Sequence, residues 1–380
     1  MRVLLLNDTS NWYHYGCTAT SSSLIDGIKQ YKHIVTSVPI TKTYEIKFAP
    51  NTKVGFLDKY NIPRFIQANP EIINLVIIND ILVINGEGTL HGLNQAPLSL
   101  LYLAYIAKVE FGKNVQILNH SAYPEHSTNI CDSEESAIYK LVYNIIDYAA
   151  IREPISFNTM KKLDINLIES FDCTPLYIKN HYVKSNIKHS KELLIAGSAS
   201  WLQLDIPSKT KGNISDFLLG LSSFNQYLHE MQSKGFKIKF LYGSKLYPAK
   251  DDREFIGYMQ KQFCVDWEIY EAKSLDDWLR TIDESTFLVS GRFHHTIAAA
   301  CLGTKFIALG SNTPKIDGLM QVLESEPAIK YNSYNIYNEL LLRTKEILDF
   351  SRSANNLVNQ TRLDYLCQKA EKNFEGLNQI

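Results

Sequence analysis

Phe287-Leu-Val-Ser-Gly-Arg-Phe-His-His-Thr296 is the stretch that decides how the rest of the chain is interpreted. Its apolar first residues predict a buried parallel strand, the Ser-Gly pair ends that strand, and an Ala-rich helix follows. In an open α/β sheet, ligands bind beyond the carboxyl ends of the strands, where the next helix directs its free N–H groups. Arg292, His294 and His295 stand at that point, so the stretch predicts an anion site that can also move protons.

The rest of the chain repeats this pattern, because short β-branched or Leu-rich runs alternate with longer helical segments. The expected strands are Val3–Leu6, His33–Val38, Ile81–Ile84, Val115–Leu118, Ala149–Arg152, Leu193–Ala196, Lys237–Tyr242, Phe287–Val289 and Phe306–Leu309. The expected helices are Thr18–Gln30, Leu98–Val109, Ser133–Asp147, Phe217–Ser233, Asp252–Gln262, one that starts at Ser274, Thr296–Cys301, and two at about Tyr334–Phe350 and Asn355–Asn373. We expect Ser274 to cap its helix, Pro154 to occupy a first helical turn, and Gly303 to end the Ala-rich helix.

The polar and basic stretch 177–190 interrupts the alternation, and we interpret it as a linker. With 380 residues, the chain is long enough for two domains of ordinary size. We therefore expect a Rossmann-like domain at 1–176, a second one at 191–333, and C-terminal helices at 334–380 that cross back. This is an α/β fold of the GT-B-like class, with two Rossmann-like domains facing a cleft.

Composition excludes several classes of function. The net charge of −1 argues against a mainly electrostatic binder of nucleic acid. The six cysteines are scattered without a Cys-x-x-Cys pair, which is typical of a reduced compartment and gives no zinc signature. No apolar run approaches the roughly 20 residues of a membrane span, and the apolar run within 1–7 is too short for a signal peptide. We expect a cytoplasmic protein with no metal ligand cluster; a peripheral contact with the inner membrane face and a homo-oligomer stay open.

Polar residues follow the ends of several strands in the first domain. In the loop Asn85–His91, glycines allow close backbone approach to a ligand, and Glu87 is a candidate base. His120 is a candidate proton carrier at the next strand end, and Arg152 ends a further strand. Each has a structural alternative: a tight turn for the loop Asn85–His91, a hydrogen-bonded structural role for His120, and an ion pair for Arg152. Tyr13 and its aromatic neighbours are candidates for stacking on a sugar or base.

The second domain offers further candidates at strand ends. Lys315 lies one strand end after the Arg292 loop and is a second candidate for anion binding. Gly197-Ser-Ala-Ser-Trp201 and Tyr242-Gly-Ser244 have small residues and hydroxyls that suit a phosphate, although both can be plain loops. Cys17 shows no sequence feature that would lower its pKa, so we do not expect a nucleophile there.

Several of these segments, taken in order, resemble the polysaccharide pyruvyl transferase family. The C-terminal signature of that family is similar to Ser290-Gly-Arg-Phe-His294, the Ala-rich helix, Gly303–Leu309 and Lys315, with Lys305 where proline is usual. Its Gly-Gly-Gly-Ser/Thr loop, its Arg-Asp-x-x-Ser segment and its later Asp-led stretch resemble Gly86-Glu-Gly-Thr89, Arg152-Glu-Pro-Ile-Ser156 and Asp172-Cys-Thr-Pro175. The family's N-terminal Asn-x-Gly-Asp is absent; Asn7 and Tyr15-Gly16-Cys17 approximate it.

The resemblance implies a transferase that moves a pyruvyl group from phosphoenolpyruvate to a sugar of a cell-surface polysaccharide or its precursor, forming a ketal. The acceptor is then a nucleotide- or lipid-linked sugar bound by the first domain, and no cofactor or metal is required. The catalytic candidates are His294, Glu87 and His120. The donor-binding candidates are Arg292, Lys315, His295, Ser290 and Gly291. The acceptor-binding candidates are Asn7, Tyr13, Gly16, Gly86, Gly88, Thr89 and Arg152.

Two other functions fit the same residues. A GT-B-type glycosyltransferase with a nucleotide-sugar donor would use Arg292 and Lys315 to neutralise a diphosphate. A non-catalytic protein that binds carbohydrates or anions would keep the fold without the chemistry. The pyruvyl transfer hypothesis fails if the Arg292 guanidinium is turned into the hydrophobic interior or tied up by an acidic neighbour, far from any groove between the two domains.

Overall fold

The computed structural model describes residues 1–11, 13–122, 133–197, 214–245, 252–310, 313–330, 335–349 and 356–378. The chain divides into two compact units. Unit 1 comprises Met1–Asn11, Ala19–Leu176 and Leu366–Ile380, and unit 2 comprises Trp12–Thr18 and Tyr177–Tyr365. The break after residue 176 coincides with the expected start of the linker. Assigning residues 12–18 to the first domain was wrong, because this segment groups with unit 2.

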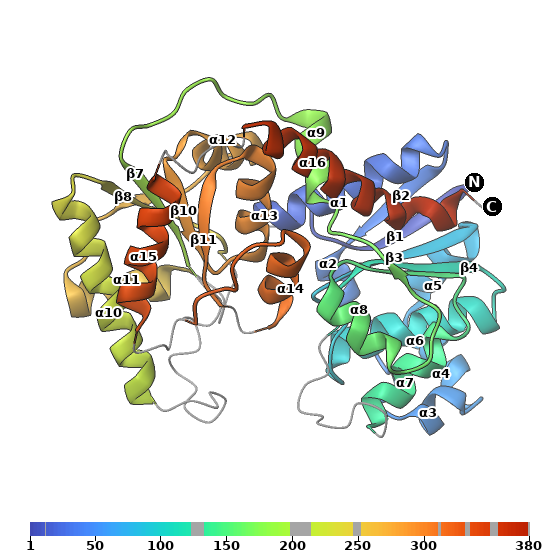
Figure 1. Ribbon diagram of the computed structural model, residues 1–380. Helices are drawn as coiled ribbons and strands as arrows, with labels where there is room; N and C mark the ends of the chain where they lie inside the picture. The colour runs from blue at the N-terminus through green and yellow to red at the C-terminus, as the bar shows by residue number, and fades with distance from the viewer. Residues whose placement is uncertain are drawn as a thin grey trace. The chain divides into compact units, whose positions relative to one another are not determined.

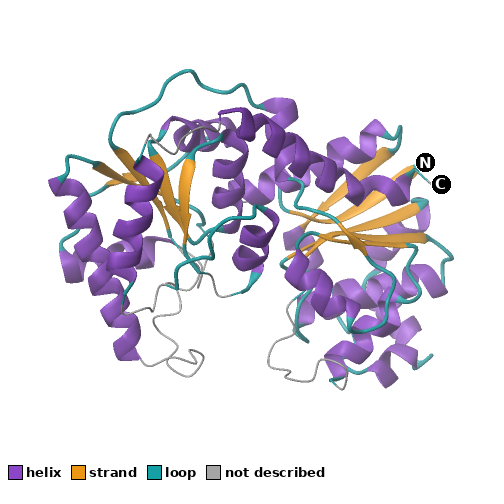
Figure 2. Cartoon of the chain, in the orientation of Figure 1, coloured by secondary structure: helices purple, strands orange, loops and turns teal. Residues whose placement is uncertain are grey.

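Unit 1 is built on a six-stranded parallel sheet with the order β2-β1-β3-β4-β5-β6. The strands are β1 (Arg2–Asp8), β2 (Ile34–Pro39), β3 (Ile81–Glu87), β4 (Asn114–His120), β5 (Tyr148–Ile151) and β6 (Ile168–Glu169). The helices are α1 (Tyr15–Gln30), α2 (Ile40–Thr43), α3 (Lys53–Leu57), α4 (Asn61–Ala68), α5 (Pro70–Ile78), α6 (Gln95–Val109), α7 (Glu134–Tyr143), α8 (Pro154–Lys161) and the start of α9 (Thr174–His181). Helices cover both faces of the sheet (Figure 2).

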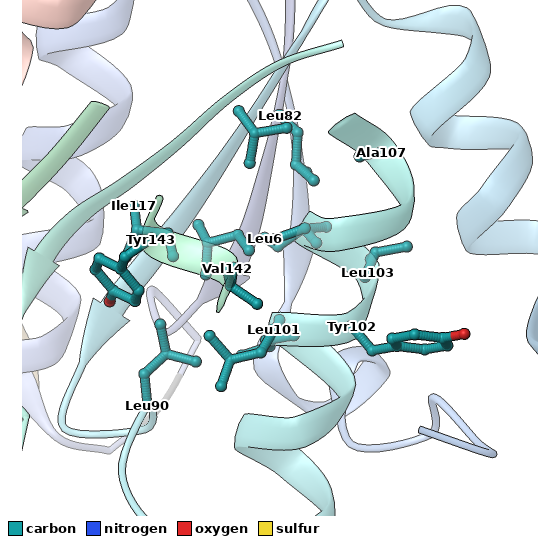
Figure 3. Packing of buried hydrophobic residues seen from close by; sticks show 14 of the residues in the cluster. Leu6, Leu82, Leu90, Leu101, Tyr102, Leu103, Ala107, Ile117, Val142 and Tyr143 are labelled. Carbon is teal, nitrogen blue, oxygen red and sulfur yellow. The ribbon is translucent and has the colours of Figure 1, made fainter. Parts of the chain in front are cut away.

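The core of unit 1 forms where apolar strands meet apolar helix faces. The central strands β1 and β3 are nearly continuous apolar runs, which is typical of strands buried on both faces. Figure 3 shows side chains of α6, including Leu101 and Leu103, packed beside Leu6 and Ile117 of the sheet and Val142 of α7. The helix α6 is apolar on nearly every side and is correspondingly buried.

Unit 2 contains a five-stranded parallel sheet with the order β11-β10-β7-β8-β9. The strands are β7 (Glu192–Ala196), β8 (Lys237–Leu241), β9 (Glu268–Tyr270), β10 (Phe287–Ser290) and β11 (Lys305–Ala308). The helices are α10 (Ile214–Ser233), α11 (Asp252–Phe263), α12 (Leu275–Glu284), α13 (Phe293–Leu302), α14 (Lys315–Val322), α15 (Ile336–Leu348) and most of α16 (Asn356–Glu371) (Figure 1). Counted within the unit, this order is the 3-2-1-4-5 arrangement of Rossmann folds.

Strand order locates the place where each sheet binds ligands. The order reverses between β1 and β3 in unit 1 and between β7 and β10 in unit 2. Such a reversal leaves a crevice beyond the carboxyl ends of the two strands, because the flanking helices leave in opposite directions. The residues beyond the carboxyl ends of these strands are therefore the candidates for a ligand site in each unit.

The expected strands are all present, with ends that differ by a few residues. Ser274 accepts a hydrogen bond from Asp277 N at 3.1 Å, Pro154 lies in the first turn of α8, and Gly303 ends α13 with a φ of 76°, so these predictions are confirmed. The strands β6 and β9 and the helices α2 to α5 were not predicted. The stretch 177–190 is only partly a linker, because α9 covers its beginning.

The C-terminus crosses back to unit 1, as predicted. The 3-10 helix η3 (Lys372–Leu377) follows α16. Asn373 Oδ1 accepts from Asn119 N at 2.8 Å, and Asn373 Nδ2 donates to Phe171 O at 2.8 Å. These buried bonds tie the end of the chain to β4 and to the segment after β6. None of the described helices has the length and hydropathy that crossing a bilayer would require.

Candidate functional site

Three asparagines connect the strand ends at the reversal point of unit 1. Asn7 and Asn119 are the last residues but one of β1 and β4, with φ values of 64° and 54°, a conformation that asparagine tolerates better than most residues. Asn7 Nδ2 donates to Asn85 O at 2.7 Å and to Thr89 Oγ1 at 3.1 Å, and Asn119 Nδ2 donates to Asn85 Oδ1 at 3.3 Å. The predicted residues Asn7 and Thr89 therefore hold one another, and together they fix the glycine-rich loop.

His120 is a structural group in this loop. A Cβ on Gly86 would lie 2.6 Å from His120 Cβ, so only glycine allows the two segments to approach. His120 Nε2 donates to Leu90 O at 2.7 Å, and its Nδ1 accepts from the Tyr143 hydroxyl. Burial lowers the pKa of His120 to about 3. Because both ring nitrogens are engaged, the geometry gives no support to the prediction that His120 carries protons in catalysis.

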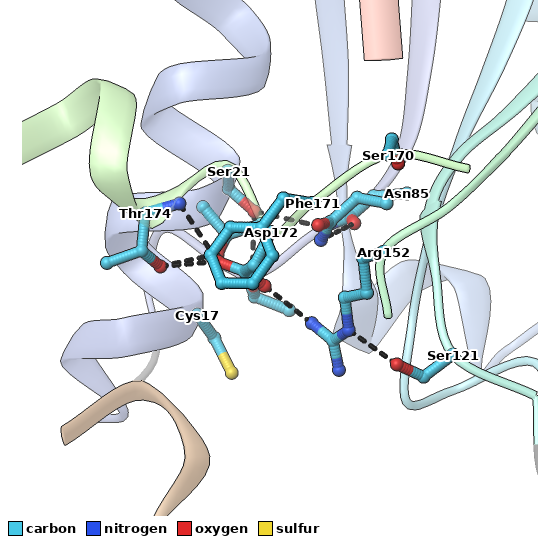
Figure 4. Close-up of polar contacts among 12 residues, drawn as sticks. Cys17, Ser21, Asn85, Ser121, Arg152, Ser170, Phe171, Asp172 and Thr174 are labelled. Atoms are coloured by element: carbon cyan, nitrogen blue, oxygen red, sulfur yellow. Dashed lines mark hydrogen bonds and ion pairs between the residues drawn. The ribbon is translucent and has the colours of Figure 1, made fainter. Parts of the chain in front are cut away.

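Arg152 is buried in an ion pair, which was the structural alternative for this residue. Its Nη1 donates to Asp172 Oδ2 at 2.8 Å, and its Nε donates to Ser121 Oγ at 2.6 Å (Figure 4). Asp172 Oδ1 also accepts from Thr174 N at 2.9 Å and from Thr20 Oγ1 at 3.1 Å. The charge of Arg152 is therefore compensated inside unit 1, and its role in acceptor binding stays a prediction.

The remaining residues of the Arg-x-x-x-Ser segment shape the same edge. Glu153 caps α8 by accepting from Ile155 N at 2.8 Å and Ser156 N at 2.9 Å. Ser156 Oγ accepts from Ala122 N at 3.0 Å, which fixes the chain just after β4. Glu87 is buried at the end of β3 with a φ of 40°. The adjacent Gly88 would place a Cβ 3.9 Å from Arg152 Nη2.

In unit 2, the loop after β10 holds its arginine against an acidic residue. Ser290 Oγ accepts from Arg292 N at 2.9 Å, which orients the loop with Gly291 at its turn. Arg292 Nη2 forms a buried ion pair with Asp252, and Asp252 Oδ2 accepts from Gly243 N at 2.6 Å. Asp252 therefore ties up part of the guanidinium, an outcome that counts against its availability to a donor. Arg292 Nε, although buried, has no hydrogen-bond partner among the described residues.

The segment 12–18 places new side chains beside this loop. Tyr15 at the start of α1 donates to Ala272 O at 2.8 Å, and its ring lies 6.4 Å from that of Trp278. A Cβ on Gly16 would lie under 3.0 Å from the Cβ, Cγ and Nδ1 atoms of His294. Burial raises the pKa of the Tyr13 hydroxyl. Tyr13 and Gly16 were predicted to bind the acceptor from the first domain, but both belong to unit 2.

His294 and His295 have different surroundings, although they are adjacent in α13. The Trp278 indole N–H donates to His295 Nε2 at 3.0 Å, and burial, together with the nearby Arg292, lowers the pKa of His295 well below its usual range. His295 is therefore a neutral core residue. The His294 ring instead lies 5.7 Å from the His14 ring in an edge-on arrangement, and its side chain is directed toward segment 12–18.

The charges around His14 are predominantly positive. Desolvation, with added repulsion from His294 and Arg292, lowers the pKa of His14 well below its usual range. Lys315, the first residue of α14, also contributes to this repulsion, and its Nζ lies 6.0 Å from the centre of the Phe293 ring. The first turn of α13 adds N–H groups without a side-chain cap. The arrangement can hold an anion.

Sequence reasoning missed several residues that shape this site. Cys17 Sγ lies 3.0 Å from His14 Nδ1, and ligand atoms of His14, Cys17 and His294 lie within 4.8 Å of one another. The expectation that the chain brings no metal ligands together is therefore wrong for these described residues. The spacing His14-x-x-Cys17 at the start of a helix was the available signal. No sequence signal pointed to Asp252, because it is far from Arg292 in sequence. Ser198 to Trp201 lie outside the described residues.

The comparisons with known proteins agree on the class. The structure resembles the UDP-GlcNAc 2-epimerase from Neisseria meningitidis bound to UDP-GlcNAc, with a TM-score of 0.58, 12% identity and 100% coverage of both chains. It also resembles the S. aureus MnaA–UDP complex, with a TM-score of 0.57 and 14% identity over 99% of this chain and 93% of that one. For the UDP-GlcNAc 2-epimerase from Methanocaldococcus jannaschii the TM-score is 0.54, with 13% identity over 97% and 99% of the chains. No curated protein matches the sequence significantly.

These similarities and the two parallel sheets define an α/β protein of the GT-B-like class. The family model for polysaccharide pyruvyl transferase matches residues 14–313. The chain belongs to the polysaccharide pyruvyl transferase family, and it is a transferase enzyme.

Proposed function

We propose that the enzyme transfers a pyruvyl group from phosphoenolpyruvate to two hydroxyls of a sugar in a cell-surface polysaccharide or its precursor. The main support is the site at the strand-order reversal of unit 2. There Arg292, Lys315 and the first turn of α13 offer positive charge and N–H donors beside His294. Phosphoenolpyruvate carries a carboxylate and a phosphate, the two anionic groups that such donors bind best.

Arg292 contributes through the part of its guanidinium that Asp252 does not hold. Its buried Nε needs a hydrogen-bond acceptor, because an unpaired buried donor costs about 1–3 kcal/mol. A carboxylate or phosphate oxygen of the donor would satisfy it. Asp252 keeps the guanidinium in place before the donor arrives, and Lys315 supplies charge that the Asp252–Arg292 pair has lost.

The proposed reaction balances without a cofactor. A proton adds to the methylene carbon of phosphoenolpyruvate, and the adjacent carbon becomes electrophilic. One sugar hydroxyl attacks that carbon, phosphate leaves, and a second hydroxyl closes the ketal. Of the two hydroxyl protons released, one replaces the proton given to the methyl group and the other leaves with phosphate. We assign the proton donor to His294, which is 5% exposed.

A donor-binding experiment tests this assignment. Arg292→Lys keeps a positive charge opposite Asp252 but loses the planar guanidinium, so it separates donor binding from folding. We expect at least a tenfold weaker affinity for phosphoenolpyruvate by calorimetry, with Tm within a few degrees of the wild type. Arg280→Ala, on the exposed face of α12, is the matched control and should change neither. Equal affinity in wild type and Arg292→Lys would remove Arg292 from the donor site.

A nucleotide-sugar glycosyltransferase is the second candidate, because two of the similar structures are complexes with UDP-GlcNAc and UDP. It predicts that UDP raises Tm and phosphoenolpyruvate does not. A nucleotide-linked acceptor in the pyruvyl transfer reaction predicts that both raise Tm. Measuring Tm with UDP and with phosphoenolpyruvate separately therefore shows whether a nucleotide binds as donor or as part of the acceptor.

A further inference from the structure

We infer that His14, Cys17 and His294 form a binding site for a zinc-like divalent cation. The three residues come from two elements that are far apart in sequence, the start of α1 and the first turn of α13. Both His14 and Cys17 belong to the segment 12–18, which is part of unit 2, so the whole site lies within one unit. Cys17 and His294 are 6% and 5% exposed, respectively.

The distances suit a tetrahedral ion. With metal–nitrogen bonds of about 2.0–2.1 Å and metal–sulfur bonds of about 2.3 Å, tetrahedral ligand atoms lie roughly 3.5 Å apart. The three ligand atoms here lie within 4.8 Å of one another, and Cys17 Sγ is 3.0 Å from His14 Nδ1. Binding an ion would therefore require these side chains to adjust toward the ideal separation.

Gly16 is the reason that the two elements come this close. A Cβ at this position would occupy the space of the His294 side chain. The glycine lies between the two ligands of segment 12–18, so His14, just before α1, and Cys17, in its first turn, flank the point of contact with α13. This close approach brings the ligands together without a long loop.

Ligand type selects the ion. One thiolate and two imidazoles favour zinc and similar borderline metals over magnesium or calcium, which prefer oxygen ligands. Three protein ligands leave one position open for water or an anionic oxygen. Of the nearby cations, Arg292 is neutralised by Asp252, which limits the repulsion of a bound metal, while Lys315 opposes it.

The site does not depend on the proposed pyruvyl transfer. His294 cannot ligate a metal ion and donate a proton from the same nitrogen, so the metal-bound form is not the form that carries out the proposed transfer. The metal is therefore measured by spectroscopy, without a donor or acceptor present. Failure of this inference leaves phosphate release from phosphoenolpyruvate intact, and failure of pyruvyl transfer leaves the metal spectrum intact.

Cobalt titration tests the inference. The 380-residue chain, reduced and without a polyhistidine tag, should bind one Co²⁺ with tetrahedral ligand-field bands and a thiolate-to-cobalt charge-transfer band. Cys17→Ala should abolish the charge-transfer band and weaken binding by more than about 100-fold, because a direct ligand is lost. Cys264→Ala removes an exposed thiol and should leave the spectrum unchanged. A missing charge-transfer band, or one that Cys17→Ala retains, overturns the site.

X-ray absorption on the zinc-loaded wild type needs no variant, so it decides the question even if Cys17→Ala does not fold. We expect one sulfur at about 2.3 Å and two imidazole nitrogens at about 2.0–2.1 Å. A first coordination shell without sulfur contradicts the inference.

Discussion

Gly16→Ala gives the sharpest test of the structure, because two physical effects predict opposite signs. Gly16 lies in α1 and its φ is not in the left-handed region, so an alanine fits the backbone. In a helix without steric conflict, the change from glycine to alanine stabilises by about 0.5–1 kcal/mol. Here, however, the added Cβ would lie under 3.0 Å from three atoms of the His294 side chain.

The steric effect should be the larger one. Relieving the overlap requires α1 or His294 to move by about an ångström, and overpacking of this kind costs roughly 1–3 kcal/mol. For a unit of this size, we expect Tm to fall by about 2–12 °C, from about 2–4 °C per kcal/mol. A shift of about 1 Å in a catalytic group also lowers turnover by about 100-fold.

Thermal unfolding followed by near-UV circular dichroism is the assay. Gly257→Ala, in the middle of α11, is the matched control, because a Cβ there meets nothing within 4 Å. We expect the control to be as stable as the wild type or slightly more stable. A Gly16→Ala variant that is as stable as Gly257→Ala would refute the packing of segment 12–18 against α13.

Three further predictions follow from the site. His120 is neutral in the folded state because its pKa falls to about 3, whereas the unfolded histidine takes up a proton near its ordinary pKa. The contribution of this residue to stability is complete above about pH 6.5 and declines as pH falls toward 3, by roughly 2 kcal/mol at pH 5. His120→Gln should reduce the pH dependence of the free energy of unfolding in urea. An unchanged pH dependence would exclude His120 as its source. Asp172→Ala leaves the buried Arg152 without its carboxylate and should lower the free energy of unfolding by about 3–5 kcal/mol. Asp364→Ala breaks the exposed pair with Lys179 and should lower it by less than about 1 kcal/mol. Similar losses of stability in the two variants would contradict the burial of the Arg152–Asp172 pair. His294→Gln should lower kcat by about 10²–10⁴-fold with little change in donor affinity, and the partly exposed His189→Gln should change neither; normal turnover would remove His294 from the chemistry.

The fold could be predicted from the sequence wherever a segment carries its own signal. The strands Phe287–Ser290 and Arg2–Asp8 each contain a continuous apolar run, and such runs are identified without tertiary information. The strand Glu268–Tyr270 is short and largely exposed, so it has no apolar pattern to detect. The helices between residues 40 and 78 are short and lack the long apolar run of α6.

The site was predicted less completely, because its partners are set by tertiary contacts. Sequence patterns located Arg292 and His294 at a strand end, since strand, loop and helix are consecutive there. They did not show that Asp252 would neutralise Arg292, because a charge pair across the fold leaves no periodic trace. Likewise, no local pattern indicates that His14 and Cys17 pack on unit 2 while the rest of α1 packs on unit 1.

Product analysis with phosphoenolpyruvate tests the central claim most directly. The enzyme is incubated with phosphoenolpyruvate and a panel of nucleotide- and lipid-linked sugars, and phosphate release is measured together with the mass and NMR spectrum of each sugar. We predict phosphate release that requires an acceptor, and a sugar that gains one ketal-linked pyruvate with its methyl resonance. Consumption of a nucleotide sugar with release of UDP, and no phosphate from phosphoenolpyruvate with any acceptor, would contradict pyruvyl transfer.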